Sequence, residues 1–227
     1  MKKQIKPICI IPARGGSKRI KNKNIINFLG KPLIYYSIKA ARDAKIFSRI
    51  IVTTDSLKIK KIALKYGAEV PFIRENRLSN NLASAKDAFV DTILKINSQN
   101  IKFHCLLYPT APLIKSSDLI KAYRKIKEEK SDGLMTIAKC LNHPLRSLVI
   151  KGKNLQFKWK RYQKKNSQDL PEFFFDCGNF YFFKTEKIIK SKSLYPKKII
   201  PYVLKIYNAV DIDNYDDLEL AKKLYGN

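Results

Sequence analysis

The sequence is poor in histidine and cysteine, which supply the nitrogen and sulfur ligands of metal sites and take part in many nucleophilic catalytic sites. Among 227 residues there are only two histidines and four cysteines. The cysteines are Cys9, Cys105, Cys140 and Cys177. They lie far apart beside apolar segments, without a second cysteine or a histidine at metal-binding spacing, so we expect buried, reduced thiols. His104 lies within an apolar run and His143 lies in "NHP", so neither belongs to a recognisable nucleophile–histidine arrangement.

Long apolar runs are also missing. A membrane-spanning helix needs about 20 apolar residues, whereas the most aromatic stretch, "FFFDCGNFYFF", is interrupted by Asp176. The opening "MKKQIKPICII" is basic, but its apolar run is too short for a signal peptide. We therefore expect a cytoplasmic protein with no membrane partner.

Acidic residues are scarce as well. There are 46 lysines and arginines against 19 aspartates and glutamates, a formal net charge of +27. This charge suits nucleic acid, an anionic membrane or a small polyanion, but scattered lysines are typical of a solvated surface. The net charge and the run "KWKRYQKK", with Trp159 and Tyr162 among cations, keep a nucleic-acid-binding protein as an alternative. The other explanation of this run is an exposed arm whose aromatic residues anchor it to a partner subunit. We expect no nucleic-acid partner.

The order of apolar segments predicts one α/β domain. The chain is 45% hydrophobic, which is enough for one sizeable core. Strands are expected at 7–12, 49–55, 68–73 and 103–109. Helices are expected to open at Pro32, to follow a cap at Ser56 and end at Gly67, to end near Gln99, and to cover 117–129. Alternation of this kind predicts a Rossmann-like, doubly wound and mostly parallel sheet.

The pattern changes after an apolar run at 133–140. Residues 141–172 contain short strands and turn residues, which predict an antiparallel excursion from the sheet. The chain is expected to rejoin the sheet at 177–183, to add a strand near 202–207 and to close with a helix from about Asn214. We therefore assign residues 1–140 and 173–227 to a catalytic α/β domain and residues 141–172 to an arm.

A basic glycine turn follows the first predicted strand, at the edge where open parallel sheets bind ligands. Gly15 and Gly16 let backbone amides turn toward an anion, and Ser17 adds a hydroxyl group. Full charges come from Arg14, Lys18 and Lys23. The turn fits neither the Walker pattern nor G-x-G-x-x-G. We interpret it as a triphosphate cradle; the alternative is an ordinary loop made basic by the excess of lysine.

Two carboxylates occur together after the last predicted strand. Asp211 and Asp213 alternate, so on a strand end they would face the same side and share one divalent cation, Mg²⁺ or Mn²⁺. Alternatively, Asp213 caps the closing helix and Asp211 is a solvated neighbour. Asp55 is a weaker third metal candidate. Cations and a metal site without a nucleophile favour direct phosphoryl or nucleotidyl transfer.

Eight segments carry a resemblance to a known family. They are "IIPARGGSKRIKNKNI", "LGKPLIYYSI", "RIIVTTD", "YGAEVPFIR", "YPTAPL", "NHPLRS", "SQDLPEFFFDCGNFYF" and "VDID". Over essentially the whole chain they resemble the cytidylyltransferases that make CMP-activated acidic sugars, which include acylneuraminate and CMP-Kdo synthetases. Within that family, "YPTAP" and "SQDLPEFFFDCGNFYF" resemble the pseudaminic acid cytidylyltransferases most.

The resemblance implies a fold, a reaction and an assembly. The fold is of the nucleotide-diphospho-sugar transferase type, and the chain is expected to be a homodimer that uses residues 141–172 as its dimer arm. The reaction joins CTP to an acidic nine-carbon sugar, with pseudaminic acid favoured, and gives a CMP-sugar and pyrophosphate. Sialic, legionaminic and Kdo acids remain alternative acceptors, as does a neutral sugar phosphate in a related nucleotidyltransferase.

The resemblance also implies residue roles. Catalytic roles fall to Arg14, Lys18 and Lys23. CTP would contact Ala13, Gly15, Gly16, Ser17, Asn24, Arg74, Pro109 and Thr110. The sugar would contact Tyr108, Arg146, Gln168 and Asp176, and Asp211 and Asp213 would hold Mg²⁺ or Mn²⁺. The sequence departs from the family pattern at three places: Tyr108 replaces the glutamine of sialic acid enzymes, "SNN" at 79–81 lacks an acidic residue, and Asn166 replaces an arginine.

Overall fold

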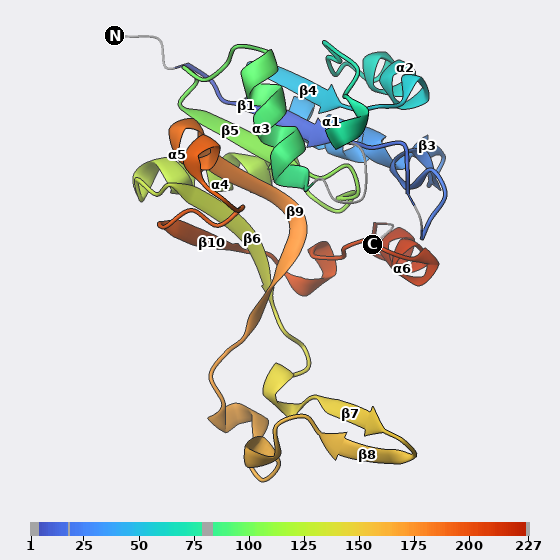
Figure 1. Ribbon diagram of the computed structural model, residues 1–227, viewed down its shortest axis with the longest axis vertical. Helices are drawn as coiled ribbons and strands as arrows, with labels where there is room; N and C mark the ends of the chain where they lie inside the picture. The colour runs from blue at the N-terminus through green and yellow to red at the C-terminus, as the bar shows by residue number, and fades with distance from the viewer. Residues whose placement is uncertain (1–4, 18, 79–83, 226–227) are drawn as a thin grey trace.

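The central sheet is built around the first buried strand that the sequence predicts. The computed structural model describes residues 5–17, 19–78 and 84–225, and its main sheet has the strand order β10-β6-β9-β5-β1-β4 (Figure 1). The strands are β1 (Ile8–Pro12), β4 (Arg49–Thr53), β5 (Phe103–Leu107), β6 (Gly133–Lys139), β9 (Phe174–Lys184) and β10 (Ile199–Val203). Within this sheet only β9 runs antiparallel to its neighbours, β5 and β6. The predicted mostly parallel α/β fold is confirmed.

Helices cover both faces of the sheet because its strands are apolar on both faces. The helices are α1 (Leu33–Ala44), α2 (Leu57–Lys65), α3 (Ala85–Lys95), α4 (Ser116–Glu128), α5 (Thr185–Lys190) and α6 (Tyr215–Tyr225). One core cluster joins α1, α2 and α4 to the sheet, and a second joins α3 and α5 to its other face. A third cluster packs α6 against the segment after β1, which includes the short strands β2 (Asn27–Phe28) and β3 (Lys31–Pro32).

Short 3₁₀ turns connect many of these elements. They are η1 (Lys23–Ile25), η2 (Asn76–Leu78), η3 (Pro144–Arg146), η4 (Lys160–Tyr162), η5 (Ser167–Asp169) and η6 (Ile206–Asn208). No helix within the described ranges is long and apolar enough to cross a membrane.

Several predicted boundaries are wrong. Residues 68–73 make only two isolated bridges, Ile51 to Glu69 and Thr54 to Ile73, because Pro71 between them has no N–H to extend a ladder. The last strand is Ile199–Val203 rather than 202–207. The helix expected to end near Gln99 ends at Lys95, and Pro32 precedes α1 instead of opening it.

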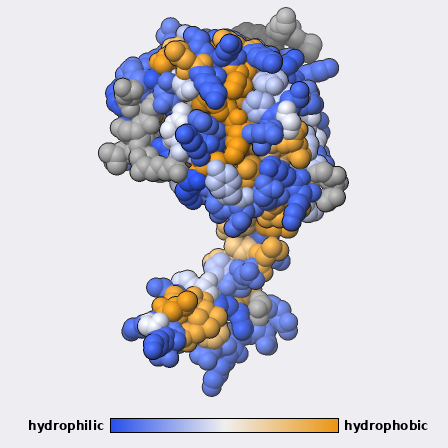
Figure 2. All heavy atoms as spheres, turned by 90° about the vertical axis from the view of Figure 1, so that its right-hand side faces the viewer, coloured by the Kyte–Doolittle hydropathy of each residue, from blue (hydrophilic) through white to orange (hydrophobic). Residues whose placement is uncertain are grey.

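An arm leaves the body where β6 and β9 extend beyond the sheet (Figure 1). It carries an antiparallel hairpin of β7 (Leu148–Lys151) and β8 (Asn154–Phe157), closed at Gly152 with φ +63°. Figure 2 shows apolar side chains gathered on the arm, where Ile150 is 80% exposed and Leu155 is 65% exposed. A two-stranded hairpin alone is marginally stable in water. Dimerisation through residues 141–172 stays a prediction.

Candidate active site at the carboxyl edge of the sheet

Two neighbouring cavities lie at the carboxyl ends of β1, β4 and β5. The larger, about 470 Å³, is lined by Arg14, Ser17, Arg19, Lys23, Asn24, Arg74, Tyr108, Pro109 and Thr110 among others. The smaller, about 320 Å³, is lined by Lys23, Tyr108, Thr110, Asp176, Gly178, Tyr181, Asp211 and Asp213. They share Lys23, Tyr108 and Thr110. A cavity of about 1030 Å³ lies where β5 begins, and none of the predicted site residues lines it.

The glycine turn is folded back onto the end of β4. The Ala13 N–H donates to the Thr53 carbonyl (2.9 Å), and the Gly15 N–H donates to the Asp55 carboxylate (2.7 Å). The amide of Gly15 is therefore used within the protein, and a direct contact between Gly15 and CTP stays a prediction. Around Gly16 there is open space. Lys18 lies outside the described residues, as does the "SNN" segment at 79–81.

The contacts of Asp55 differ from those expected of a metal ligand. Its carboxylate accepts the Gly15 N–H and lies 4.0 Å from the guanidinium of Arg74. Asp55 lines neither cavity at this edge. It therefore holds protein segments and does not group with Asp211 and Asp213 as a metal ligand.

Arg74 is a buried cation in the wall of the larger cavity. Arg74 is only 4% exposed, and its backbone N–H donates to the Thr54 carbonyl (2.8 Å). Burial lowers the pKa of Arg74, the Asp55 carboxylate opposes this effect, and the nearby Arg14 adds to it. An arginine stays protonated in proteins, so this wall presents positive charge to the cavity.

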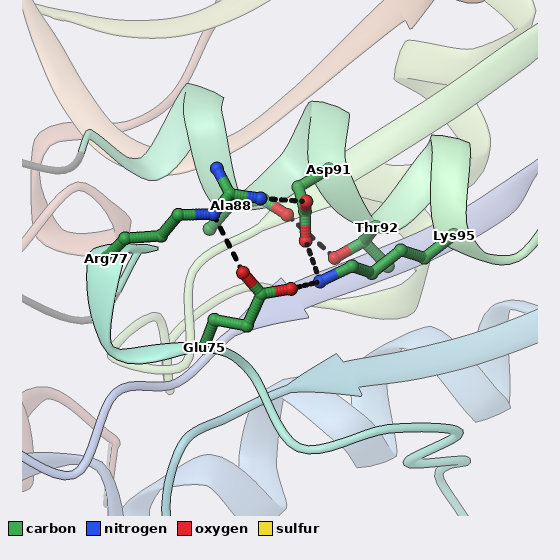
Figure 3. A network of polar contacts seen from close by, with 6 residues as sticks. All are labelled: Glu75, Arg77, Ala88, Asp91, Thr92 and Lys95. Atoms are coloured by element: carbon green, nitrogen blue, oxygen red, sulfur yellow. Dashed lines mark hydrogen bonds and ion pairs between the residues drawn. The ribbon is translucent and has the colours of Figure 1, made fainter.

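An ion-pair network ties the segment after Arg74 to α3 (Figure 3). Glu75 accepts from Arg77 (2.8 Å) and Lys95 (2.6 Å), and Asp91 pairs with the same two cations at 3.4 and 3.2 Å. Exposed pairs contribute little individually, but a network limits how far a segment moves. The first turn of α3 also lines the larger cavity, so the network joins two parts of its wall.

The two predicted metal-binding aspartates are placed by the residue between them. Ile212 is fully buried in the third cluster together with Ile20 of the basic turn. Lys23 Nζ donates to the Ile212 carbonyl (2.7 Å) and to Asp213 Oδ1 (3.2 Å). Arg19 also pairs with Asp213, at 2.7 Å. Tertiary packing therefore brings the acidic segment to the cationic turn.

Strand alternation and helix capping do not explain this acidic segment. Residues 211–213 are not in strand conformation, so our argument from alternation is wrong. The capping alternative is also wrong, because Asn214 accepts the Asp217 N–H and Asp217 accepts the Asn214 N–H, each at 2.9 Å.

Asp211 differs from Asp213 in forming no direct ion pair within the described residues, although the charges of Lys23 and Arg19 lower its pKa in part. Within the described residues no hydrogen bond or ion pair to its carboxylate occurs. Neighbouring protein atoms and then the charge of Asp213 raise the pKa of Asp211 to about 6, although its side chain keeps contact with solvent. Its Oδ2 lies 3.3 Å from where a Cβ on Gly178 would be, and Gly178 has φ +60°. A carboxylate without a direct ion-pair partner fits a divalent cation.

The protein offers only a few ligands for such a cation. No group of three or more histidine, cysteine or carboxylate side chains in the described part of the chain is arranged to hold a metal. Two aspartates can nevertheless hold Mg²⁺ when substrate phosphates and water supply the remaining oxygens. The residues therefore fit a substrate-assisted magnesium site.

Beside the predicted Tyr108, the smaller cavity adds the hydroxyl group of Tyr181, which our sequence analysis missed. Tyr181 donates to Asp176 Oδ1 (2.5 Å), and the Gly178 N–H reaches the same oxygen (3.0 Å). Tyr108 and Tyr181 meet edge to face at 5.8 Å between ring centroids. Burial raises the pKa of both tyrosines, so both stay neutral hydroxyl groups. The arrangement can bind a polyhydroxylated molecule beside an anionic ligand.

Arg146 and Gln168 belong to η3 and η5 of the arm and line neither of the two cavities. Arg146 donates to the Lys165 carbonyl, and its guanidinium lies 6.0 Å from the Phe157 ring. The same chain therefore does not bring them to Tyr108 and Asp176. Their contact with a sugar stays a prediction that requires a second copy of the chain.

The chain is similar to known proteins in sequence and in fold. A family described as cytidylyltransferase matches residues 8–226. A pseudaminic acid cytidylyltransferase of Campylobacter jejuni is 42% identical over 226 residues, covering 97% of this chain and 97% of the relative. A CMP-N,N'-diacetyllegionaminic acid synthase of Legionella pneumophila is 29% identical, covering 96% and 95% respectively. A solved CMP:2-keto-3-deoxy-manno-octonic acid synthetase complexed with CTP has a TM-score of 0.74 at 15% identity, covering 97% of this chain and 98% of that structure, and supports the fold alone.

Proposed function

Because this chain belongs to the cytidylyltransferase family, we propose that it transfers the cytidylyl group of CTP to a nonulosonic acid, with pseudaminic acid as the favoured acceptor. The observation that carries the proposal is the pair of adjoining cavities that share Lys23, Tyr108 and Thr110. One cavity is lined by cations and the other by carboxylates and tyrosines. Two substrates bound in them would meet at Lys23.

The larger cavity is the proposed CTP site. Arg14, Lys23 and the buried Arg74 offer positive charge to a triphosphate, and Ser17 and Asn24 offer polar groups in the same wall. Lys23 lies at the junction with the smaller cavity, where it would offset the charge that develops on the pyrophosphate leaving group. Lys18 belongs to the same basic turn and is proposed to act with it.

The smaller cavity is the proposed acceptor site. The anomeric hydroxyl oxygen of the sugar forms a bond to the α-phosphorus, the bond from that phosphorus to the bridging oxygen breaks, and pyrophosphate leaves with that electron pair. The hydroxyl proton passes to solvent. Asp176, held by the Tyr181 hydroxyl, can accept a sugar hydroxyl or amide N–H. Tyr108 lies where the two substrates meet.

Asp211 and Asp213 are proposed to hold Mg²⁺ or Mn²⁺. The Asp211 carboxylate, which has no direct ion-pair partner among the described residues, supports this assignment, and the two ion pairs of Asp213 orient the second carboxylate. When bound, the cation would supply positive charge that weakens repulsion between the sugar oxygen and the α-phosphate.

We propose that the protein works in the cytoplasm as a homodimer. The exposed apolar side chains of the arm support this assembly, because a second copy would cover them. In such a dimer Arg146 and Gln168 would lie near the partner's acceptor site. Loss of dimerisation after truncation of the β7–β8 hairpin, measured by light scattering, is the expected result; an unchanged mass would contradict it.

The reaction is tested by measuring pyrophosphate release with each of four nucleoside triphosphates. The acceptors are pseudaminic, sialic, legionaminic and Kdo acids, each with Mg²⁺. We expect the highest kcat/KM for CTP with pseudaminic acid. A preference for sialic, legionaminic or Kdo acid would change the acceptor, and release with none of them would contradict the proposed function.

A further inference from the structure

Two segments of the proposed CTP site are attached to one side chain that does not line it. Asp55 Oδ1 accepts the Gly15 N–H at 2.7 Å, and the same oxygen lies 4.0 Å from Arg74 Nη2. Gly15 belongs to the basic turn after β1, and Arg74 follows the bridge between Thr54 and residue 73. One carboxylate thus contacts both cation-bearing segments.

The fit between the turn and the residues beneath it is close. A Cβ on Gly15 would lie 3.1 Å from Ser56 Cβ and 3.6 Å from Asp55 Oδ1. The absence of a side chain therefore lets the backbone of the turn approach residues 55 and 56 closely enough for the hydrogen bond. Asp55 itself is half-buried, with a side chain 21% exposed.

We propose that Asp55 is a positioning residue for the nucleotide, an inference that rests on the proposed function. It fixes the turn by accepting the Gly15 N–H, and its charge stabilises the buried Arg74 guanidinium in the wall of the cavity. Arg14 and Arg74 then face the triphosphate from fixed positions. Fixed positions matter because a preorganised site does not lose binding energy to the ordering of its own groups.

A carboxylate near a triphosphate could instead weaken binding by repulsion. Asp55 lines neither cavity, one of its oxygens accepts an N–H, and the nearest cation is almost fully buried. Its charge therefore acts mainly on Arg74 and on the turn. Removal of Asp55 should therefore weaken CTP binding.

The test compares Asp55→Ala, Asp55→Asn and Ser56→Ala in the full-length protein. The Kd for CTP is measured by calorimetry, and kcat and KM are measured for CTP and for the acceptor. Hydrogen bonds to charged groups contribute enough for Asp55→Ala to raise the Kd for CTP by about 10- to 100-fold. The acceptor KM should change by less than about twofold, because Asp55 does not touch the acceptor cavity.

The other two variants separate positioning from general stabilisation. Asp55→Asn keeps an oxygen for the Gly15 N–H but loses the charge beside Arg74, so its Kd should lie between those of wild type and Asp55→Ala. Ser56→Ala removes the side-chain cap of α2, whose oxygen accepts the Ile59 N–H at 3.4 Å. It should lower the thermal unfolding midpoint and leave the Kd for CTP within about twofold.

Each remaining outcome decides against one of the proposals. Wild-type protein that does not bind CTP would overturn the proposed function and this inference with it. Wild-type binding with equal or tighter binding by Asp55→Ala would overturn this inference alone. If Asp55→Ala does not fold, the Kd of Asp55→Asn for CTP is the deciding measurement. A Kd equal to that of wild type would overturn the inference. If Asp55→Ala weakened CTP binding and raised the acceptor KM by the same factor, Asp55 would have only a structural role, and the inference would be wrong.

Discussion

Replacing Lys23 with alanine should separate its catalytic contribution from its structural one. The ammonium group donates to the Ile212 carbonyl at 2.7 Å and to Asp213 at 3.2 Å, and the side chain is 19% exposed. Asp213 keeps the Arg19 guanidinium at 2.7 Å, so the substitution does not leave that carboxylate unpaired. We expect a loss of about 1–2 kcal/mol in the free energy of unfolding, which a folded domain tolerates.

The effect on catalysis should be larger than the effect on stability. Removal of one donor to a developing charge typically costs about 3 kcal/mol, which corresponds to about 10² to 10³ in kcat. Lys23→Ala should therefore lower kcat for pyrophosphate release at least about 100-fold, and the thermal unfolding midpoint should remain well above the assay temperature.

Lys21→Ala is the matched control for Lys23→Ala. Lys21 belongs to the same basic segment, is exposed and lines neither of the two cavities. Its substitution removes an equal charge and should change kcat by less than about threefold, because exposed charges are screened. A Lys23→Ala enzyme with near wild-type kcat would refute the assigned role. Equal losses in both variants would show that only net charge matters.

Three further predictions concern the metal site, its support and the core. Asp211→Asn should raise the Mg²⁺ concentration for half-maximal rate more than about tenfold, and in wild type this concentration should rise below about pH 6, where Asp211 takes a proton; an unchanged titration would contradict a metal role. Gly178→Ala should also raise the Mg²⁺ concentration for half-maximal rate, because the new Cβ would lie 3.3 Å from Asp211 Oδ2 and Gly178 has φ +60°. An unchanged Mg²⁺ titration would show that the Asp211 side chain can move aside without loss of function. His104 is fully buried between Ser98 and Thr185, and burial lowers its pKa to about 3. Because the unfolded imidazole takes a proton near pH 6.5, the stability from neutral His104 is present above that pH and should fall by about 2 kcal/mol at pH 5. Urea unfolding of His104→Gln should lack this decrease, and equal decreases would refute the assignment.

The sequence predicted best those features that depend on short-range rules. Ser56 caps α2 and Gly67 follows it with φ +86°, both as the local pattern indicates. The first strand and the basic turn also lie where an apolar run followed by glycines predicts them. Such features depend on backbone conformation and on hydrogen bonds between near neighbours, which a few residues determine.

The sequence predicted less well those features that depend on partners distant in the chain. Residues 68–73 have strand-like composition, but Pro71 and the edge position reduce them to two bridges. Asp55 was predicted to end a strand and resembled a possible metal ligand, yet it lies two residues beyond β4 and its partner is the amide of Gly15, forty residues earlier. A carboxylate can bind a metal, an amide or a guanidinium equally well, so only the fold decides among them.

The acidic segment near the C-terminal helix shows why some site geometry was predicted for the wrong reason. We placed Asp211 and Asp213 on one side of a strand, whereas the structure anchors them through Ile212, which packs with Ile20 in the core. Lys23, a predicted phosphate ligand, and Asp213, a predicted metal ligand, contact each other as a result. Binding of a triphosphate and a metal at this point would therefore have to reorganise an existing ion pair. Because Asp213 also pairs with Arg19, Lys23 can turn toward phosphate without leaving a carboxylate uncompensated. Asp213 is thus the better-compensated carboxylate of the pair, and Asp211 is the carboxylate at which we propose that a cation from solution binds.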